Sequence, residues 1–261
     1  MKNASLAELV HLNLAETLRE ITRRSAGIIL ERDGVLLYAA GPGDPGLWNG
    51  AVRINPQLGA GKILTMADEF FRELGRGYAL HTFDQLDQDL DEALQQAGRQ
   101  PQVAAPEMIL ETPMAEIELP ADAVIEEVSD DQGREDFLVV VTAAFKTLGV
   151  EPEIWRRAYP EISSLAAPHI AAVVTYVDGA PAAAAMIYLS HAIAEIVHVG
   201  AHPDYRRRGL GELVTRAVTG EGFNRGARLA SLQATPMADS LYRRMGYQEI
   251  GRYQWYIFPP K

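Results

Sequence analysis

Three consecutive arginines followed by two glycines form the segment of this sequence best suited to chemistry. Arg206, Arg207 and Arg208 stand immediately before Gly209, and Gly211 follows two positions later. Arginine carries forked donors that match phosphate oxygens. Glycine lets a backbone N–H group approach an anion without a clash from Cβ. The segment therefore predicts a site for a phosphate or diphosphate group.

The residues around this segment predict a strand that leads straight into a helix. Residues 194–201 predict a strand, and the Arg206–Gly211 turn is expected to open a helix that runs to about Glu221. The first N–H groups of a helix have no acceptor within the helix and lie at the positive end of its dipole. A turn between a strand and a helix N-terminus is therefore a natural position for a pyrophosphate.

Two other phosphate-binding motifs are excluded. A dinucleotide-binding fingerprint needs a third glycine at position 214, which is Val214. The Gly61-Lys62 pair resembles the end of a P-loop. However, Pro56 stands in place of its first glycine and Ile63 in place of its Ser or Thr. Neither nucleotide-binding interpretation is supported.

The strand, the arginine-glycine turn and the helix together resemble the acetyl-CoA signature of the GCN5-related N-acetyltransferase (GNAT) family. That signature is written (Q/R)-x-x-G-x-(G/A), and here it reads Arg206-x-x-Gly209-x-Gly211. The resemblance covers residues 123–258 and includes the order of the predicted elements. It implies an acyl-CoA N-acyltransferase fold and an enzyme that uses acetyl-CoA as cosubstrate. The acetyl group would pass to the primary amine of a small molecule or peptide, by direct attack in a ternary complex.

The resemblance also implies which residues contact coenzyme A. They are Val199, Ala201, Arg206, Arg207, Arg208, Gly209, Leu210, Gly211 and Thr235. In the family, backbone groups at the positions of Val199 and Ala201 pair with the pantetheine arm and polarise the thioester carbonyl. Gly200 between them is expected to mark a bulge or a close approach of two backbones. Thr235 departs from the family pattern, because an asparagine often contacts coenzyme A there.

A tyrosine near the C-terminal end is the expected general acid. It lies in a second family pattern, which reads Leu241-Tyr242-x-x-x-Gly246-Tyr247. In many members a tyrosine at the position of Tyr242 protonates the departing thiolate, and a neutral phenol suits that task. A core aromatic residue before a capping glycine is the alternative interpretation of Tyr242.

Glu195 in the predicted strand is the expected general base. It matches a strand glutamate that takes the amine proton in histone-type members, directly or through water. A strand carboxylate without a catalytic role is the alternative interpretation. His198 and His202 are rival bases, because imidazole titrates near neutrality. Their i, i+4 spacing on a strand predicts that they share one face.

The C-terminal half predicts a mixed α/β sheet. A strand at 124–128 and two helices precede three strands, and a helix, a strand, a helix and a strand follow them. The second helix is expected to run from Pro152 to about Leu165. Asp178-Gly179 predicts a two-residue hairpin turn between the first two of the three strands. This order is too rich in strands for a helical bundle and too irregular for a doubly wound sheet.

The N-terminal half mixes helices and strands but carries no catalytic cluster. Ser5 and Glu8 predict a capping box at the start of a helix. Thr65 and Asp68 predict the start of another helix, which ends at Gly75.

The N-terminal half resembles, more loosely, the degenerate first domain of tandem GNAT proteins. The segment where the signature would stand, residues 56–61, holds no basic residue. We therefore expect residues 1–120 to form a GNAT-like domain without a coenzyme A motif. Residues 121–261 are expected to form the catalytic GNAT domain.

Composition excludes several other classes of protein. The net charge of −11 argues against a nucleic-acid-binding protein, which needs a basic face. No run of about 18 to 20 apolar residues is present, so no membrane span is expected. The absence of cysteine excludes disulfides and thiolate metal sites, and we predict no bound metal. Without a secretion signal in the first residues, a cytoplasmic location is expected.

A non-catalytic acyl-CoA-binding or sensing protein is the alternative function, and an interaction domain on the same scaffold is a third. The presence of both Glu195 and Tyr242 favours the enzyme over a sensor that has lost its proton-transfer groups. The sequence does not identify the acceptor amine. It also leaves the oligomeric state open, a homodimer included.

Overall fold

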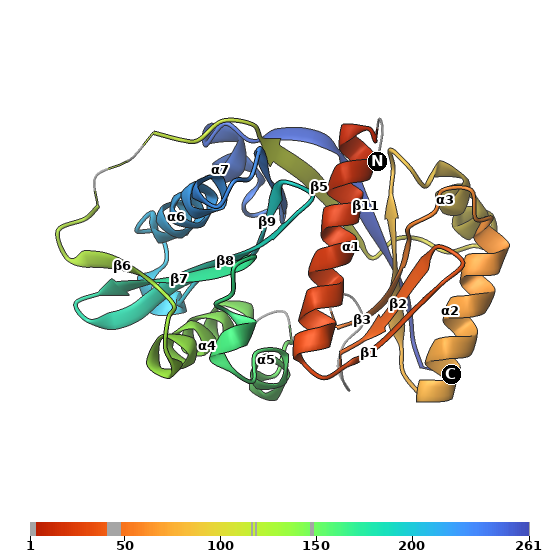
Figure 1. The fold of residues 1–261 in the computed structure, drawn as a ribbon, viewed down its shortest axis with the longest axis horizontal. Coiled ribbons are helices and arrows are strands. Elements are labelled where there is room, and N and C mark those ends of the chain that lie inside the picture. Colours follow the sequence, from red (N-terminus) through yellow and green to blue (C-terminus); the bar gives the residue numbers. More distant parts are fainter. Residues whose placement is uncertain (1–3, 41–47, 116, 118, 147–148, 261) are drawn as a thin grey trace. The chain divides into compact units, whose positions relative to one another are not determined.

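The computed structural model describes residues 4–40, 48–115, 117, 119–146 and 149–260. The chain divides into two compact units (Figure 1). Unit 1 comprises Met1–Met108, Gln233–Met237 and Glu249–Lys261, and unit 2 comprises Ile109–Leu232 and Ala238–Gln248. The expected division into a GNAT-like domain of residues 1–120 and a catalytic domain of residues 121–261 stays a prediction.

Unit 2 holds the segments that carry the candidate chemistry. Its elements in chain order are β6 (Ala123–Glu127), α4 (Asp131–Phe145), α5 (Pro152–Ala158), η2 (Ile162–Ser164), β7 (Ile170–Val177), β8 (Ala180–Ser190), β9 (Ile193–Ala201), η3 (Pro203–Tyr205), α6 (Leu210–Asn224), β10 (Leu229–Gln233) and α7 (Asp239–Arg244). The predicted mixed α/β order is confirmed.

The unit 2 strands lie in the order β10-β9-β8-β7-β6. The neighbours are antiparallel except β9 and β10, which run parallel. Helices α4 and α6 both pack on β7, β8 and β9, and they cover opposite faces (Figure 1). The strands between them are rich in alanine, valine and isoleucine and are almost fully buried, as expected for strands covered on both faces.

The hairpin between β7 and β8 turns at the predicted dipeptide. Asp178 and Gly179 have φ angles of 50° and 77°. Two central residues with positive φ match the right-handed twist of the flanking strands. The predicted two-residue turn is therefore confirmed.

Unit 1 repeats much of this element order. Its elements are α1 (Leu6–Arg24), β1 (Ile28–Arg32), β2 (Val35–Ala39), β3 (Asn49–Arg53), α2 (Ala60–Leu74), β4 (Tyr78–Phe83), α3 (Gln88–Gln96) and β5 (Val103–Leu110), and it also takes in most of β11 (Gln248–Phe258). Its strand order is β1-β2-β3-β4-β11-β5, with β3 and β4 parallel. Helix α1 covers one face, and α2 and α3 cover the other (Figure 1). Each unit thus has an antiparallel hairpin, a third strand, a helix and a parallel fourth strand in sequence.

The first helix begins where the sequence predicts. The Ser5 side chain accepts the backbone N–H of Glu8, and the Glu8 carboxylate accepts that of Ser5. This is the predicted capping box.

Two predicted helix boundaries are wrong. Helix α2 begins at Ala60 with Gly59 as its cap, before the predicted start at Thr65 to Asp68. Its buried stripe already includes Ile63, so packing outweighs the low helix propensity of glycine in the first turn. Helix α5 ends at Ala158 rather than near Leu165. Pro160 disfavours helical backbone at the residue before it.

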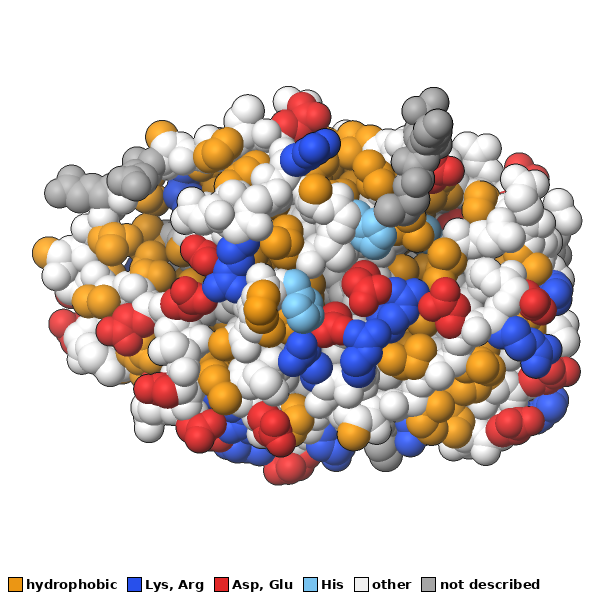
Figure 2. All heavy atoms as spheres, in the orientation of Figure 1, with side chains coloured by type: hydrophobic (Ala, Val, Ile, Leu, Met, Phe, Trp, Pro, Cys, Tyr) orange, Lys and Arg blue, Asp and Glu red, His pale blue; other side chains and the backbone are white. Residues whose placement is uncertain are grey.

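The surface of the protein carries charges of both signs. Acidic and basic side chains are interspersed over the face shown in Figure 2. Within the described part of the chain, no helix is both long enough and apolar enough to cross a membrane.

The contact between α6 and β9 leads to a stability prediction. A Cβ at Gly222 would lie 2.5 Å from the Cβ of Ala194, whereas a Cβ at Gly220 would meet nothing within 4 Å. Gly222→Ala should therefore lower the free energy of unfolding by about 1–3 kcal/mol, because α6 must move away from the sheet. The matched change Gly220→Ala should raise it by about 0.5–1 kcal/mol through helix propensity. Urea denaturation measures both, and a shift of the same sign in the two variants would contradict the packing argument.

Candidate active site

Strand β9 carries a bulge near its C-terminal end. Met186 pairs with Val197 and Ala184 pairs with Gly200, so two residues of β9, His198 and Val199, stand opposite the single residue Ala185 of β8. His198 has a φ angle of 57°, in the left-handed region. A bulge of this kind bends the strand and increases its local twist.

The sequence predicted either a bulge or a close approach at Gly200. In the structure these two features lie at different residues. The bulge lies at His198 and Val199, so that part of the prediction is wrong. A Cβ at Gly200 would lie 2.7 Å from the Cβ of Ala144 and 3.3 Å from the ring of Phe145. Gly200 therefore allows the close approach of α4 to β9, as one of the two expectations had it.

The parallel pairing between β9 and β10 ends just before the bulge. It joins Ile193–Ile196 to Leu229–Leu232 in register, while β9 continues to Ala201. The described ladder with β10 thus stops five residues before the end of β9. On that edge, the later backbone groups of β9 are in a position to pair with an extended ligand, as an added strand would. Val199 and Ala201 lie in this part of β9.

The turn after β9 presents backbone N–H groups at the start of α6. Arg207 and Gly209 both have left-handed backbones, with φ angles of 63° and 77°. Gly209 is the N-cap of α6, and no side chain caps this helix end. A Cβ at Gly209 or Gly211 would meet nothing within 4 Å. Successive N–H groups in such a turn form a concave anion site, so the residues present fit a diphosphate.

Two of the three arginine side chains of the turn are held within unit 2. The Arg206 guanidinium donates to the carbonyl oxygens of Ala144 at 3.1 Å and Ala201 at 3.5 Å. Arg208 donates to the Asp122 carboxylate at 2.6 Å. All three side chains are exposed. The backbone is therefore the better defined part of this anion site, and the side-chain contacts with coenzyme A stay a prediction.

Glu195 is buried in the sheet beside a serine. It is 1% exposed and pairs in register with Ser231 of β10. The Ser231 hydroxyl donates to a Glu195 carboxylate oxygen at 2.5 Å. Burial raises the pKa of Glu195 to about 7, and the Ser231 hydrogen bond opposes this rise. A base with such a pKa can take a proton at neutral pH and release it again.

The two histidines have different surroundings. His198 is buried against aromatic rings, and burial lowers its pKa to about 3. His202 lies beyond the end of β9 and caps η3, where it accepts the N–H of Asp204 at 3.4 Å. The prediction placed both histidines on one strand, and this is wrong for His202, because β9 ends at Ala201. A group with a pKa near 3 is a weak base at neutral pH, so Glu195 is the stronger candidate.

Tyr242 lies in α7 with its side chain 5% exposed. Burial raises its pKa to about 12, and a hydrogen bond with Thr215 acts in the opposite direction. Thr215 is one helical turn beyond Gly211, whose carbonyl oxygen accepts the Thr215 hydroxyl at 2.7 Å. Tyr242 therefore lies near the first turns of α6 and stays protonated at neutral pH. Neighbouring Tyr247 bonds instead to Thr219, at 2.7 Å.

Two residues whose hydroxyl groups bond to the predicted site residues were not predicted: Ser231, which bonds to Glu195, and Thr215, which bonds to Tyr242. Ser231 and Thr215 carry no signal in the sequence, because each is identified only by the tertiary neighbour that it contacts. Thr235 follows β10 in the segment Gln233–Met237, which belongs to unit 1. In the described ranges no three His, Cys, Asp or Glu side chains converge as metal ligands.

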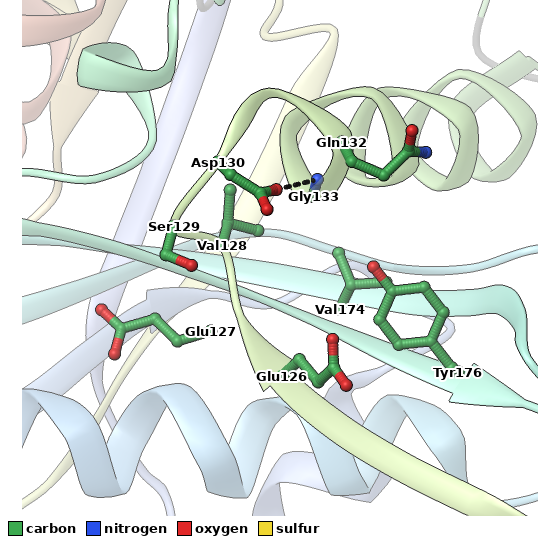
Figure 3. A pocket seen from close by; sticks show the side chains of 9 residues that line it. All are labelled: Glu126, Glu127, Val128, Ser129, Asp130, Gln132, Gly133, Val174 and Tyr176. Carbon is green, nitrogen blue, oxygen red and sulfur yellow. Dashed lines mark hydrogen bonds between the residues drawn. The ribbon is translucent and has the colours of Figure 1, made fainter.

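A pocket at the other edge of the unit 2 sheet lies apart from these residues. It is bounded by β6, by Val174 and Tyr176 of β7, and by the start of α4 (Figure 3). Glu126, Glu127 and Asp130 line it, and Asp130 caps α4 by accepting the N–H of Gly133 at 2.8 Å. None of the predicted site residues lines this pocket.

Comparisons with known proteins agree with the geometry. The family model described as "Acetyltransferase (GNAT) family" matches residues 136–247. A GCN5-related N-acetyltransferase from Kribbella flavida superposes with a TM-score of 0.78 at 20% identity, over 99% of this chain and 98% of the other. One from Sphaerobacter thermophilus gives 0.62 at 16% identity, over 98% and 93%.

A tandem GNAT protein from the clavulanic acid biosynthesis pathway gives a TM-score of 0.61 at 14% identity, over 87% of this chain and 78% of the other. At these identities the structural matches establish the fold. No curated protein sequence matches the chain. Residues 136–247 therefore form a domain of the acetyltransferase (GNAT) family.

Proposed function

We propose that unit 2 catalyses acetyl transfer from acetyl-CoA to a primary amine of a small molecule or peptide. The observation that carries the proposal is the open turn between β9 and α6. It combines left-handed backbone at Arg207 and Gly209, a helix N-terminus without a side-chain cap, and free space over Gly211. Such a turn binds a diphosphate through backbone N–H groups and the helix dipole.

Coenzyme A supplies the activated thioester, and this chain supplies its orientation. In the proposal, the N–H groups of Gly209, Leu210 and Gly211 bind the diphosphate. The edge of β9 beyond Ile196 then binds the pantetheine arm as an added strand. The backbone of Val199 polarises the thioester carbonyl, and one oxyanion donor of this kind contributes about 3 kcal/mol to the barrier reduction.

Two buried groups move the protons. The amine must lose a proton as the C–N bond forms and the C–S bond breaks. In the proposal an ordered water relays that proton to Glu195, because the Glu195 carboxylate is too deeply buried for the amine to contact it directly. Tyr242 gives its phenol proton to the departing thiolate and regains one from solvent, and Glu195 releases its proton to solvent before the next turnover. Burial keeps Tyr242 protonated and keeps Glu195 near its titration point, so each group has the pKa that its role needs.

Calorimetric binding of coenzyme A, paired with thiol release from acetyl-CoA over a panel of amines, tests the function. We expect both binding and turnover in the wild type. Gly211→Leu should weaken coenzyme A binding at least about tenfold, since its side chain enters the space left for the ligand. Gly220→Leu, in the open on the same helix, is the matched control and should bind normally. Binding without turnover for any amine would favour a sensing protein, and no binding at all would leave an interaction scaffold.

Removing the Tyr242 hydroxyl tests whether Tyr242 is the general acid. Tyr242→Phe should lower kcat about 100-fold, because the thiolate loses its proton donor, and should leave the Kd of coenzyme A nearly unchanged. Tyr247→Phe removes a second buried hydroxyl that also bonds to α6, and it should retain kcat. Steady-state kinetics distinguish the two variants. Equal kcat values for Tyr242→Phe and the wild type would exclude the acid role.

The base is tested by a charge-neutral substitution. Glu195→Gln should lower kcat about 100-fold. It should also change how stability depends on pH. The Glu195 pKa is about 7 in the folded protein and 4.5 as an ordinary carboxyl, so folding disfavours its ionisation. Below pH 4.5 the raised pKa of Glu195 does not lower the free energy of unfolding. As the pH rises from 4.5 to 7 the free energy of unfolding falls, and above pH 7 the loss stays constant.

At about 1.4 kcal/mol for each pH unit, the raised pKa lowers the free energy of unfolding by about 3 kcal/mol above pH 7. Glu195→Gln should therefore be more stable than the wild type at pH 8 and close to it at pH 4, as measured by urea denaturation at both values. An equal stability difference at the two pH values would show that Glu195 ionises freely in the folded protein.

A further inference from the structure

We propose that His198 is a positioning residue for the acyl-CoA site. Its buried ring holds the left-handed bulge that turns the backbone of Val199 towards the cosubstrate. This inference rests on the proposed function and adds a residue to it that does not touch the reacting atoms.

The backbone of His198 is unusual for its place in the fold. Its φ angle is 57°, and it lies within an otherwise extended strand. Residues other than glycine seldom adopt this conformation, although histidine does so more often than most. In a turn, local hydrogen bonds can favour it. In the middle of a strand, contacts of the side chain must favour it instead.

Three aromatic rings provide such contacts. The ring centroid of His198 lies 4.9 Å from that of Trp155, 5.7 Å from that of Tyr159 and 6.4 Å from that of Phe145. The interplanar angles are 87°, 80° and 79°, so all three contacts are edge-to-face. This geometry is attractive between rings. The three rings come from α4, α5 and the residue that ends α5.

The layer that holds these rings is fixed against β9. Trp155 is 2% exposed and Tyr159 is 0% exposed, so neither ring can turn away without repacking the core. Gly200 leaves room for Ala144 and Phe145 of α4 to approach the strand directly. The imidazole of His198 is therefore restrained from the α4–α5 side, and its backbone is restrained with it.

The bulge also coincides with the point where the sheet opens. The pairing with β10 stops at Ile196, two residues before His198. Without the extra residue in β9, the register would shift by one and every later side chain would change face. Val199 would then take a different orientation from the one that the bulge gives it. The conformation of His198 thus determines which backbone groups face the opened edge.

The surroundings of the ring argue against a proton-transfer role. They are aromatic and almost completely shielded from solvent. Burial also lowers the pKa of His198. The ring restrains the backbone of His198 through its shape and its edge-to-face contacts.

Two substitutions separate the backbone role from a merely structural one. His198→Val and His198→Asn both remove the ring. Asparagine tolerates the left-handed conformation, whereas a β-branched residue does not. We expect the Kd of coenzyme A to rise several-fold in His198→Asn, which loses only the ring contacts, and at least tenfold in His198→Val, which also disfavours the left-handed backbone. Calorimetry at a temperature where circular dichroism shows each variant folded measures both.

A second pair of variants tests the aromatic contacts. Trp155→Leu removes a ring that touches His198, and it should raise the Kd of coenzyme A several-fold. Phe137→Leu is the matched control. Phe137 is buried in α4 and contacts Tyr159, with ring centroids 5.8 Å apart, and its removal should leave the Kd unchanged.

The outcomes are distinguishable. If the wild type binds coenzyme A and His198→Val binds it equally well, the positioning role is wrong and the proposed function stands. If affinity falls in all four variants in proportion to their loss of thermal stability, His198 is only a core residue and the inference fails. A wild type that binds no coenzyme A would overturn the proposed function and this inference together.

Discussion

The candidate site depends on the separation of β9 from β10 after four paired residues. Parallel pairing as far as Ile196 holds the strands together and brings Ser231 beside Glu195. Beyond that point the bulge at His198 redirects β9, and its edge is no longer matched by β10 in the described ladder. The same pair of strands therefore fixes a buried carboxyl group and, further along β9, leaves the edge that the proposed pantetheine contact uses.

Burial sets the protonation of Glu195 and Tyr242 in the direction that the proposed acetyl transfer requires. A carboxyl and a phenol are both neutral when protonated, so removing water favours the protonated form of each. Glu195 is brought from its ordinary range to about 7, whereas Tyr242 moves further above neutrality to about 12. Burial thus gives a carboxyl group that titrates near neutral pH and a phenol that stays protonated there, which are the states that the proposed base and acid need. The same burial means that ionised Glu195 destabilises the folded protein at high pH.

The two units show how similar element order can have different consequences. In each, a third strand leads into a helix and a parallel strand follows. In unit 2 the helix begins at Gly209 with a φ of 77° after three arginines. In unit 1 it begins at Gly59 with an extended backbone and a φ of −65°. Only the first arrangement combines positive charge with a left-handed turn.

The sequence alone determined the features that depend on near neighbours. The capping box at Ser5, the turn at Asp178-Gly179 and the glycine turn before α6 are local, and each is fixed by the conformations its own residues allow. The tertiary structure decided the rest. Glu195 acquires Ser231, 36 positions away, only through the register of two strands. The start of α2 and the bulge at His198 likewise follow from packing against distant residues, which no local pattern in the sequence encodes.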